Sequence, residues 1–304
     1  MFRVIPDNTK IKFTRLKFTA FLFSSIFSLI SVLGVAFIGL NLGIDFRGGI
    51  IIEVRTNDIN VSDLRSELSD LKLGEISIQE FGSPNDFLIR VERQLGMDDA
   101  QQEAVEKIKS KFNEVFLDKI EYRRLEFVGP SVSRDLVSKG VMAIFFAVIA
   151  MLVYIWFRFE LPFAMGAVIA LIHDVVLTLG LFSFVGLEFN LSTVAAILLI
   201  IGYSMNDTVV VYDRVRENLR KFKKMNFEEL IDKSVNETLS RTFNTTATTI
   251  LALGTLYFIG GQIISDFSFA MLWGIVVGTY SSIFIASTVL TFLNVRSFSK
   301  NKES

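Results

Sequence analysis

The chain has 304 residues, of which 51% are hydrophobic and 21% charged, and 30 are phenylalanines. Its 31 basic and 32 acidic residues give a net charge of -1, which excludes a nucleic-acid-binding protein that relies on a basic surface. The lack of cysteine excludes disulfides, thiolate zinc sites and a cysteine nucleophile, and a single histidine excludes metal sites that need two imidazoles. An apolar excess of this size, with a mean hydropathy of +0.48, is typical of an integral membrane protein.

Six apolar stretches are long enough to cross a bilayer, which takes about 20 residues in a helix. They are Phe18–Leu40, Gly140–Phe157, Leu161–Val185, Phe189–Tyr212, Thr242–Gly260 and Phe267–Leu293. The first follows a basic segment, residues 1–17, and is too long for the apolar core of a signal peptide, which has about 7–15 residues. We therefore interpret it as a retained membrane anchor.

The distribution of Lys and Arg predicts the orientation of the spans. These residues are frequent in the N-terminal segment, in the loop 213–241 and in the tail 294–304, whereas the loops around Gly186–Glu188 and Gly260–Asp266 have none. Basic residues in short loops mark the cytoplasmic side. Both termini are therefore predicted to be cytoplasmic, the spans after the first to fill residues 140–293, and the long segment 41–139 to lie outside the cytoplasm.

The extracytoplasmic segment 41–139 alternates between strand and helix patterns. In chain order we expect a β-branched strand, a helix, two strands of period two joined by a turn, a long helix and a final strand. These elements are Ile50–Val54, Val61–Leu71, Ile76–Phe81, Phe87–Val91, Met97–Phe116 and Ile120–Val128. The order β-α-β-β-α-β is that of a ferredoxin-like fold. The predicted fold class is thus a six-span α-helical membrane protein with an α+β ferredoxin-like extracytoplasmic domain.

The cytoplasmic loop 213–241 contains an amphipathic helical pattern. Its apolar positions are Phe227, Leu230, Ile231, Val235 and Leu239. A helix of this kind either lies in the membrane interface or docks on the ends of the chain's own helices. The pattern alone does not distinguish these two arrangements.

Ionisable residues inside spans are the first candidates for function. They are His173 and Asp174 in the third span and Asp207, preceded by Asn206, in the fourth. Such a residue costs about 2.5–3.5 kcal/mol on insertion scales and usually faces the interior of a helix bundle. Burial favours the protonated form of Asp207 and a nearby guanidinium favours the ionised form, so a pair whose separation changes would take up and release a proton. The alternative is a static residue held by hydrogen bonds.

A polar face at the start of the fifth span could supply the guanidinium. It consists of Arg241, Asn244, Thr245 and Thr248. Residues three and four apart share a helix face, and this face is predicted at the membrane depth of Asp207. The alternative for Arg241 is that its side chain extends to the membrane interface and takes no part in a site.

Two further features are interpreted as structural. The small residue Gly166 shares a face with Asp174, so we favour a structural hydrogen bond for the His173–Asp174 pair, with a part in a proton path as the alternative. Gly274 and Gly278 form a Gly-x-x-x-Gly pair in the sixth span, which predicts close packing of helices.

Enzyme activity is not expected. Asp174 and Asp207 on neighbouring spans would suit an intramembrane aspartyl protease, but the Gly-x-Gly-Asp sequence of those enzymes is missing. The chain also has neither a Gly-x-Ser-x-Gly nucleophile motif nor a phosphate-binding P-loop. We predict no catalytic residue, no metal and no cofactor.

Five blocks of sequence carry a resemblance to a known family. They are Gly43–Gly49, Val128–Ser133, Ile201–Asn218, Thr238–Thr245 and Gly278–Phe284. In this order the chain resembles the SecD/SecF family of bacterial protein-export membrane proteins, in the resistance-nodulation-division superfamily. The stretch Thr208–Asp213 favours the SecF branch over SecD. Arg47 and Ser133 depart from the family pattern, so the role of Arg47 in the entry loop stays open.

The resemblance implies a multi-pass protein of the bacterial inner membrane that acts with SecD, often with YajC, beside the SecYEG channel. It implies use of the proton-motive force to promote late translocation of preproteins, with Asp207 and Arg241 as proton-path residues. The other polar residues named above, Asn206, Asn244, Thr245, Thr248, His173 and Asp174, would give polar support. Six spans are half of a complete superfamily transporter, and SecD would supply the other half. The chief alternative is a scaffold that stabilises SecD or the channel; a small-molecule half-transporter is a third hypothesis. Besides these proteins, only membrane lipid is expected as a partner, and nucleic acid is not.

Overall fold

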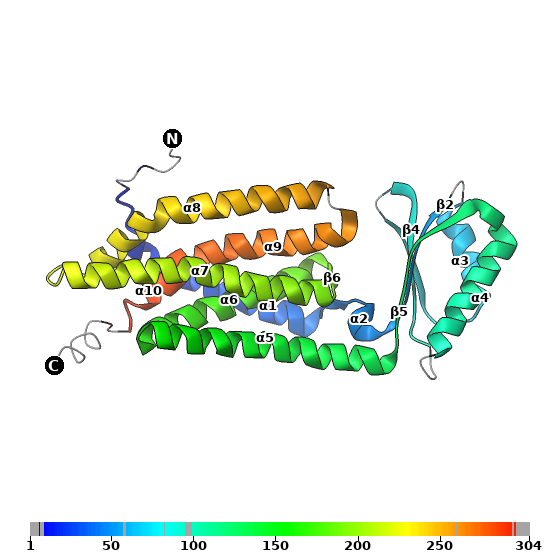
Figure 1. The fold of residues 1–304 in the computed structure, drawn as a ribbon, viewed down its shortest axis with the longest axis horizontal. Coiled ribbons are helices and arrows are strands. Elements are labelled where there is room, and N and C mark those ends of the chain that lie inside the picture. Colours follow the sequence, from blue (N-terminus) through cyan, green and yellow to red (C-terminus); the bar gives the residue numbers. More distant parts are fainter. Residues whose placement is uncertain are drawn as a thin grey trace. The chain divides into compact units, whose positions relative to one another are not determined.

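The computed structural model describes residue 6 and residues 9–56, 59–81, 83–94, 99–259, 261–293 and 295. Contacts divide the chain into two compact units. A helical unit comprises Met1–Asn41, Met142–Leu187 and Ser192–Ser304, and a sheet unit comprises Leu42–Val141 and Glu188–Leu191 (Figure 1).

The sheet unit contains four antiparallel strands and two longer helices. In chain order they are β2 (Gly49–Thr56), α3 (Val61–Ser69), β3 (Ile76–Phe81), β4 (Ser83–Val91), α4 (Asp99–Phe116) and β5 (Ile120–Val128). The strands lie in the order β3-β4-β2-β5, and every neighbouring pair is antiparallel. The order of strands and helices along the chain is the predicted one, and the first two residues of the predicted helix Met97–Phe116 lie outside the described residues.

The core of the sheet unit follows from the period of two in β2. Ile50, Ile52 and Val54 alternate along this strand and are fully buried. They pack in one apolar cluster with buried side chains of both helices, among them Leu68 of α3 and Ile108 of α4. The helices therefore cover one face of the sheet, and the alternation of apolar and polar residues in the sequence indicates which strand residues lie on that face.

The entry segment of the sheet unit depends on two glycines and on a strand from far along the chain. Gly48 and Gly49 have φ values of 74° and 123°, which L-residues rarely adopt. A Cβ on Gly49 would lie 2.7 Å from the carbonyl oxygen of Val91. The short strand β6 (Glu188–Phe189) joins this segment, and the N–H of Gly43 donates to the carbonyl of Phe189 at 2.9 Å. The predicted fourth span therefore starts with a strand, and its helix begins at Leu191.

The helical unit is built from long helices that run alongside one another (Figure 1). They are α1 (Lys17–Phe37), α5 (Pro130–Arg158, which belongs to this unit from Met142 on), α6 (Leu161–Val185), α7 (Leu191–Lys221), α8 (Phe227–Ile259) and α9 (Gly261–Ser281), followed by a π-helical turn η3 (Ser282–Ala286) and α10 (Ser287–Val289). Gly140, the predicted start of the second span, lies inside α5, and the helix itself begins at Pro130, since proline is favoured in the first helical turn.

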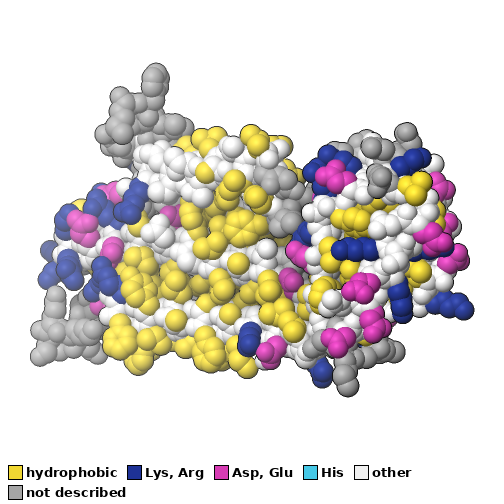
Figure 2. All heavy atoms as spheres, turned by 45° about the vertical axis from the view of Figure 1, so that its right-hand side comes forward, with side chains coloured by type: hydrophobic (Ala, Val, Ile, Leu, Met, Phe, Trp, Pro, Cys, Tyr) yellow, Lys and Arg dark blue, Asp and Glu magenta, His cyan; other side chains and the backbone are white. Residues whose placement is uncertain are grey.

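Among the described residues, five helices are long and apolar enough to cross a membrane. They correspond to the predicted first, second, third, fourth and sixth spans. The predicted fifth span, Thr242–Gly260, is not one of the five: it is helical up to Ile259, but Asn244 and several threonines lower its hydropathy, and Gly260 lies outside the described residues. Figure 2 shows a broad hydrophobic surface over the helices, with Lys and Arg gathered at the end where α7 finishes.

The amphipathic pattern of the cytoplasmic loop is part of α8 and is docked on the chain itself. Leu230, Ile231 and Val235 are each at most 1% exposed. Asn218 of α7 donates to the hydroxyl of Ser234 at 3.0 Å beside them. Of the two arrangements that the pattern left open, the structure shows the docked helix, because its apolar face is covered by neighbouring helices.

Candidate functional site

Asp207 is buried in the interior of the helical unit. It lies on α7, and only 3% of its surface is exposed. Its Oδ2 atom has no hydrogen-bond partner among the described residues. A buried carboxylate oxygen without a hydrogen-bond partner is costly, because it gives up hydration and gains no hydrogen bond in its place. Asp207 is therefore a residue whose protonation or whose surroundings must change when it becomes charged.

Arg241 acts on Asp207 from a distance. The two residues interact electrostatically, but no ion pair of 4.0 Å or less joins them in the described structure. Arg241 is exposed at the point of α8 where the predicted fifth span begins. The pair predicted from the sequence is thus brought into the same region, with the guanidinium outside the chain's own interior.

The other polar residues predicted beside Asp207 lie at or near the surface of the chain. Asn206, Asn244 and Thr248 are exposed, and Thr245 is half-buried. The hydroxyls of Thr245 and Thr248 donate to backbone carbonyls one turn earlier on α8, at 3.1 and 2.9 Å. The hydroxyls of these threonines are thus satisfied within α8, and the face is a polar surface of that helix.

Asp174 is the centre of a second buried cluster. Its Oδ1 lies 3.0 Å from Nδ1 of His173, and its Oδ2 accepts hydrogen bonds from Ser204 at 2.6 Å and Ser281 at 2.8 Å. Asp174 is 1% exposed and His173 7% exposed. Since these partners lie on α6, α7 and α9, one carboxyl group joins three helices. The structural hydrogen bond expected for this pair is present, within a larger network than expected.

The network continues toward the end of α9 through hydroxyl groups. Thr208 and Ser282 share a hydrogen bond of 2.8 Å, and Ser282 donates to the carbonyl of Ser204 at 3.3 Å. Tyr280, whose ring lies beside His173, shares a 3.1 Å hydrogen bond with Ser24 of α1. These hydroxyl residues were not predicted as part of a site, because serine and threonine in a helix are usually interpreted as small packing residues. The four-residue spacing of Ser204 and Thr208 on α7 is the sequence feature that could have indicated them.

Gly274 and Gly278 lie where α9 meets α7. A Cβ on Gly274 would overlap the side chain of Ile200, and one on Gly278 would lie 2.9 Å from Cβ of Ser204. Both glycines therefore permit a close approach of the two helices. The same approach brings Ser281 within reach of Asp174. No group of three or more His, Asp or Glu side chains suited to a metal ion occurs in the part of the chain that the structure describes.

Long apolar helices with buried carboxyl groups among them, together with a small antiparallel sheet unit, define a polytopic membrane protein. The family profile for the C-terminal part of the protein export membrane proteins SecD and SecF matches residues 107–296. The SecD/SecF GG motif matches residues 34–58, which include Gly48 and Gly49. The chain therefore belongs to the SecD/SecF family.

Relatives and solved structures agree with this assignment. The protein translocase subunit SecF of Rickettsia felis is 46% identical over 98% of this chain and 96% of that protein. The SecF of Rickettsia rickettsii is 47% identical over the same shares. The crystal structure of SecDF, a translocon-associated membrane protein from Thermus thermophilus, matches with a TM-score of 0.83 and 32% identity. The match covers 94% of this chain and 39% of SecDF, so the chain spans well under half of that protein.

Proposed function

We propose that this chain is an auxiliary subunit of the bacterial Sec preprotein translocase. It acts with SecD, and with YajC, beside the SecYEG channel, and uses the proton-motive force to promote late translocation and release of exported proteins. Membership of the SecD/SecF family and relatives named protein translocase subunit SecF support this role. The chain has no catalytic chemistry of its own in this proposal and needs no cofactor.

Asp207 is the proton carrier in this mechanism. The observation that carries the proposal is a carboxyl group at 3% exposure whose Oδ2 has no partner among the described residues. With the guanidinium of Arg241 at a distance, the neutral form is favoured and a proton is taken up; when Arg241 approaches, the charged form is favoured and the proton leaves. The proton is the better candidate than sodium, since a guanidinium beside the carboxylate opposes a bound metal cation.

SecD completes the site. Asn206, Arg241, Asn244 and Thr248 present exposed polar groups at membrane depth, and polar side chains at that depth usually face a protein interior or a water-filled cavity. A neighbouring helix bundle of SecD would cover this face and add a further acidic group. The solved SecDF chains, of which this chain covers 39% and 41%, are long enough to contain such a second half.

The proposed role as a translocase subunit also implies how the chain crosses the membrane. The second half of α8 is the predicted fifth span and completes the set of six, because its polar face is shielded by SecD and its other face is apolar. The sheet unit is a ferredoxin-like extracytoplasmic domain, supported by its β-α-β-β-α-β order and its strand order β3-β4-β2-β5. Both termini lie in the cytoplasm of a bacterium, and the helices lie in its inner membrane.

The test is preprotein export in cells whose only copy of this chain carries Asp207→Asn. Asparagine keeps the size of the side chain and removes the proton, so export should stop while membrane level and association with SecD stay normal. Asp207→Glu, which keeps the carboxyl group, should retain part of the activity. Normal export with Asp207→Asn would overturn the proton-carrier role and leave the scaffold alternative, as would a loss of export that comes with a loss of assembly.

A further inference from the structure

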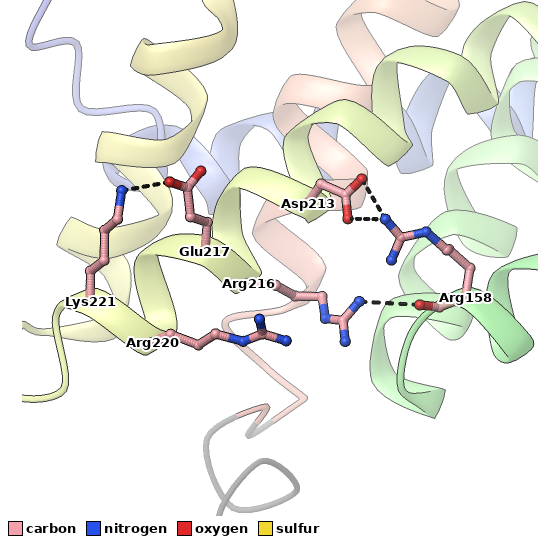
Figure 3. Close-up of a pocket in the computed structure, with 6 residues that line it drawn as sticks. All are labelled: Arg158, Asp213, Arg216, Glu217, Arg220 and Lys221. Carbon is pink, nitrogen blue, oxygen red and sulfur yellow. Dashed lines mark hydrogen bonds and ion pairs between the residues drawn. The ribbon is translucent and has the colours of Figure 1, made fainter.

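A charged cavity lies at the polar end of the helical unit, apart from Asp207 and Asp174. It has a volume of about 320 Å³ and is formed by the last residue of α5 and the last three turns of α7 (Figure 3). Its lining residues are Arg158, Asp213, Arg216, Glu217, Arg220 and Lys221. Four cations and two carboxylates thus surround one hollow, and the excess charge is positive.

Two of the guanidinium groups are held in place by the protein. Arg158 forms an ion pair with both oxygens of Asp213, at 2.8 and 2.9 Å. Arg216 donates to the backbone carbonyl of Arg158 at 3.2 Å. Both guanidinium carbons lie over the ring of Phe159, 4.9 and 5.3 Å from its centre. Because Phe159 is only 5% exposed, its ring is a rigid support for the two cations.

The carboxylates of the cavity do not neutralise the remaining cations. Asp213 is occupied by Arg158, and Glu217 binds Lys221 and Arg214. Glu160, on the neighbouring loop, forms an ion pair of 3.7 Å with Arg216. Each of these carboxylates therefore already has a cationic partner, and the lining cation that has no partner among the described residues lies on the next turn of α7.

Arg220 is the lining cation that has no partner among the described residues. It forms no hydrogen bond or ion pair with any residue that the structure describes. It follows Arg216 by four residues, and Figure 3 shows both guanidinium groups extending to the same side of α7. Like charges at this spacing destabilise a helix. An anion between them would turn this repulsion into two attractive contacts, in the bidentate geometry that guanidinium groups offer to phosphate.

The cavity lies at the level of lipid headgroups. Immediately before Arg158 on α5, Trp156 and Phe157 are 57% and 86% exposed, as is usual for aromatic residues at a membrane–water interface. On α7 the apolar run ends at Tyr212, one residue before the cavity begins. Basic pockets between membrane helices at this depth bind the headgroups of anionic lipids. We infer that Arg216 and Arg220, supported by Arg158, bind the phosphate of an anionic phospholipid.

Native mass spectrometry of the purified full chain tests this inference. The probes are dioleoyl phosphatidylglycerol and, as the neutral comparison, dioleoyl phosphatidylcholine. The site variant is Arg216→Gln with Arg220→Gln, and the matched control is Lys223→Gln with Lys224→Gln, which removes the same charge from the adjacent loop, outside the cavity. We expect phosphatidylglycerol to bind about tenfold more weakly to the site variant, with no change in the control and weak binding of phosphatidylcholine throughout.

Three results would overturn the inference. Equal losses in the two double variants would show that bulk charge alone attracts the lipid. Equal binding of the two lipids to the unaltered chain would remove the role of the anion. Displacement of phosphatidylglycerol by an excess of inorganic phosphate would identify a site for small free anions. The single variant Arg220→Gln guards against misfolding, because Arg220 has no partner to lose among the described residues, and it should weaken phosphatidylglycerol binding without changing thermal stability.

Discussion

The hydroxyl of Ser204 donates a hydrogen bond of 2.6 Å to the carboxylate of Asp174 between α7 and α6. Ser204 lies three residues before Asp207 on α7, so this contact helps to fix the rotation of the helix that carries the proposed proton carrier. Ser281 of α9 binds the same oxygen at 2.8 Å. The buried carboxyl of Asp174 thus joins three helices, and its removal should weaken the packing of all three.

Asp174→Ala should destabilise the protein more than removal of either serine. Hydrogen bonds between membrane helices contribute about 0.6 kcal/mol each on average, so we expect a loss of about 0.6 kcal/mol for Ser204→Ala. Asp174→Ala removes the acceptor for both serines and for His173, and should cost about 2 kcal/mol. Thermal unfolding of the purified protein in detergent measures both changes.

The double variant provides the control for this junction. If Ser204 acts through Asp174, Ser204→Ala should add almost nothing to the effect of Asp174→Ala. Full additivity of the two losses would contradict the junction. The same comparison made with Ser281→Ala would show whether α9 depends on Asp174 in the same way.

Gly278→Ala should separate α9 from α7. The new Cβ would lie 2.9 Å from Cβ of Ser204, and overpacking of this kind costs about 1–3 kcal/mol. Gly254→Ala on α8 is the matched control, because a Cβ there meets nothing within 4 Å; it should leave the stability unchanged or raise it by about 0.4–1 kcal/mol. Unfolding in detergent distinguishes them, and equal effects would refute the close approach at Gly278.

The elements with strong periodicity could be predicted from the sequence, and those that depend on distant partners could not. The apolar residues at every second position of Ile50–Val54 predict the core strand β2, because alternate residues of a strand lie on the same face and this face is the buried one. The strand at Glu188–Phe189 has two residues and no pattern; it exists because the entry segment at Gly43 pairs with it. The extension of α5 back to Pro130 could not be predicted in this way, because an apolar stretch marks only the apolar part of a helix and the residues before Gly140 are largely polar.

The candidate site shows the same division. Asp207 stands out in the sequence because an ionisable residue inside an apolar run is costly unless it faces a protein interior. It is buried as expected. Whether Arg241 contacts it depends on the rotation of α8 about its axis, which three-to-four spacing does not define. The serines around Asp174 were missed for this reason too: their role arises only when three helices meet.

Asp86→Asn should destabilise the sheet unit at neutral pH but not in acid. Arg55 and Asp86 are cross-strand partners on β2 and β4, joined by hydrogen bonds of 2.6 and 2.7 Å. The hydrogen bond from Arg55 lowers the pKa of Asp86 below its usual value. A lowered pKa in the folded state gives stability that is complete above the unfolded-state pKa of about 3.9 and is lost as the pH falls below it.

Hydrogen exchange of the amides in β2 and β4 measures this pH dependence. Protection should be lower in Asp86→Asn than in the unaltered chain at pH 7, and the difference should shrink as the pH falls below about 4, the unfolded-state pKa, toward the lowered pKa of Asp86 in the folded protein. Asp135→Asn is the control, because its ion pair with Lys139 is exposed and such pairs contribute about 0–1 kcal/mol. A difference for Asp86→Asn that stays constant with pH would contradict the role of its charge.

Asp232→Ala should release the segment before α1 from α8. Its carboxylate accepts hydrogen bonds from the backbone N–H and the hydroxyl of Thr14, at 2.8 and 2.9 Å. Loss of two such bonds, each contributing about 0.5–1.5 kcal/mol net, should raise the fraction of open segment about tenfold. Trypsin should then cut after Lys12 and Arg15 about tenfold faster, since cleavage follows the open population.

The matched control for this segment is Glu229→Ala, which removes a carboxylate from the same turn of α8 that no described residue binds. It should leave the cleavage rate unchanged. Asn236 holds the same segment independently, through hydrogen bonds of 3.0 and 2.8 Å to the backbone N–H and carbonyl of Ile11. Asn236→Ala should therefore accelerate cleavage as Asp232→Ala does, and the double variant should exceed both. If Asp232→Ala cleaves at the rate of the control, the two hydrogen bonds to Thr14 do not hold the segment in solution.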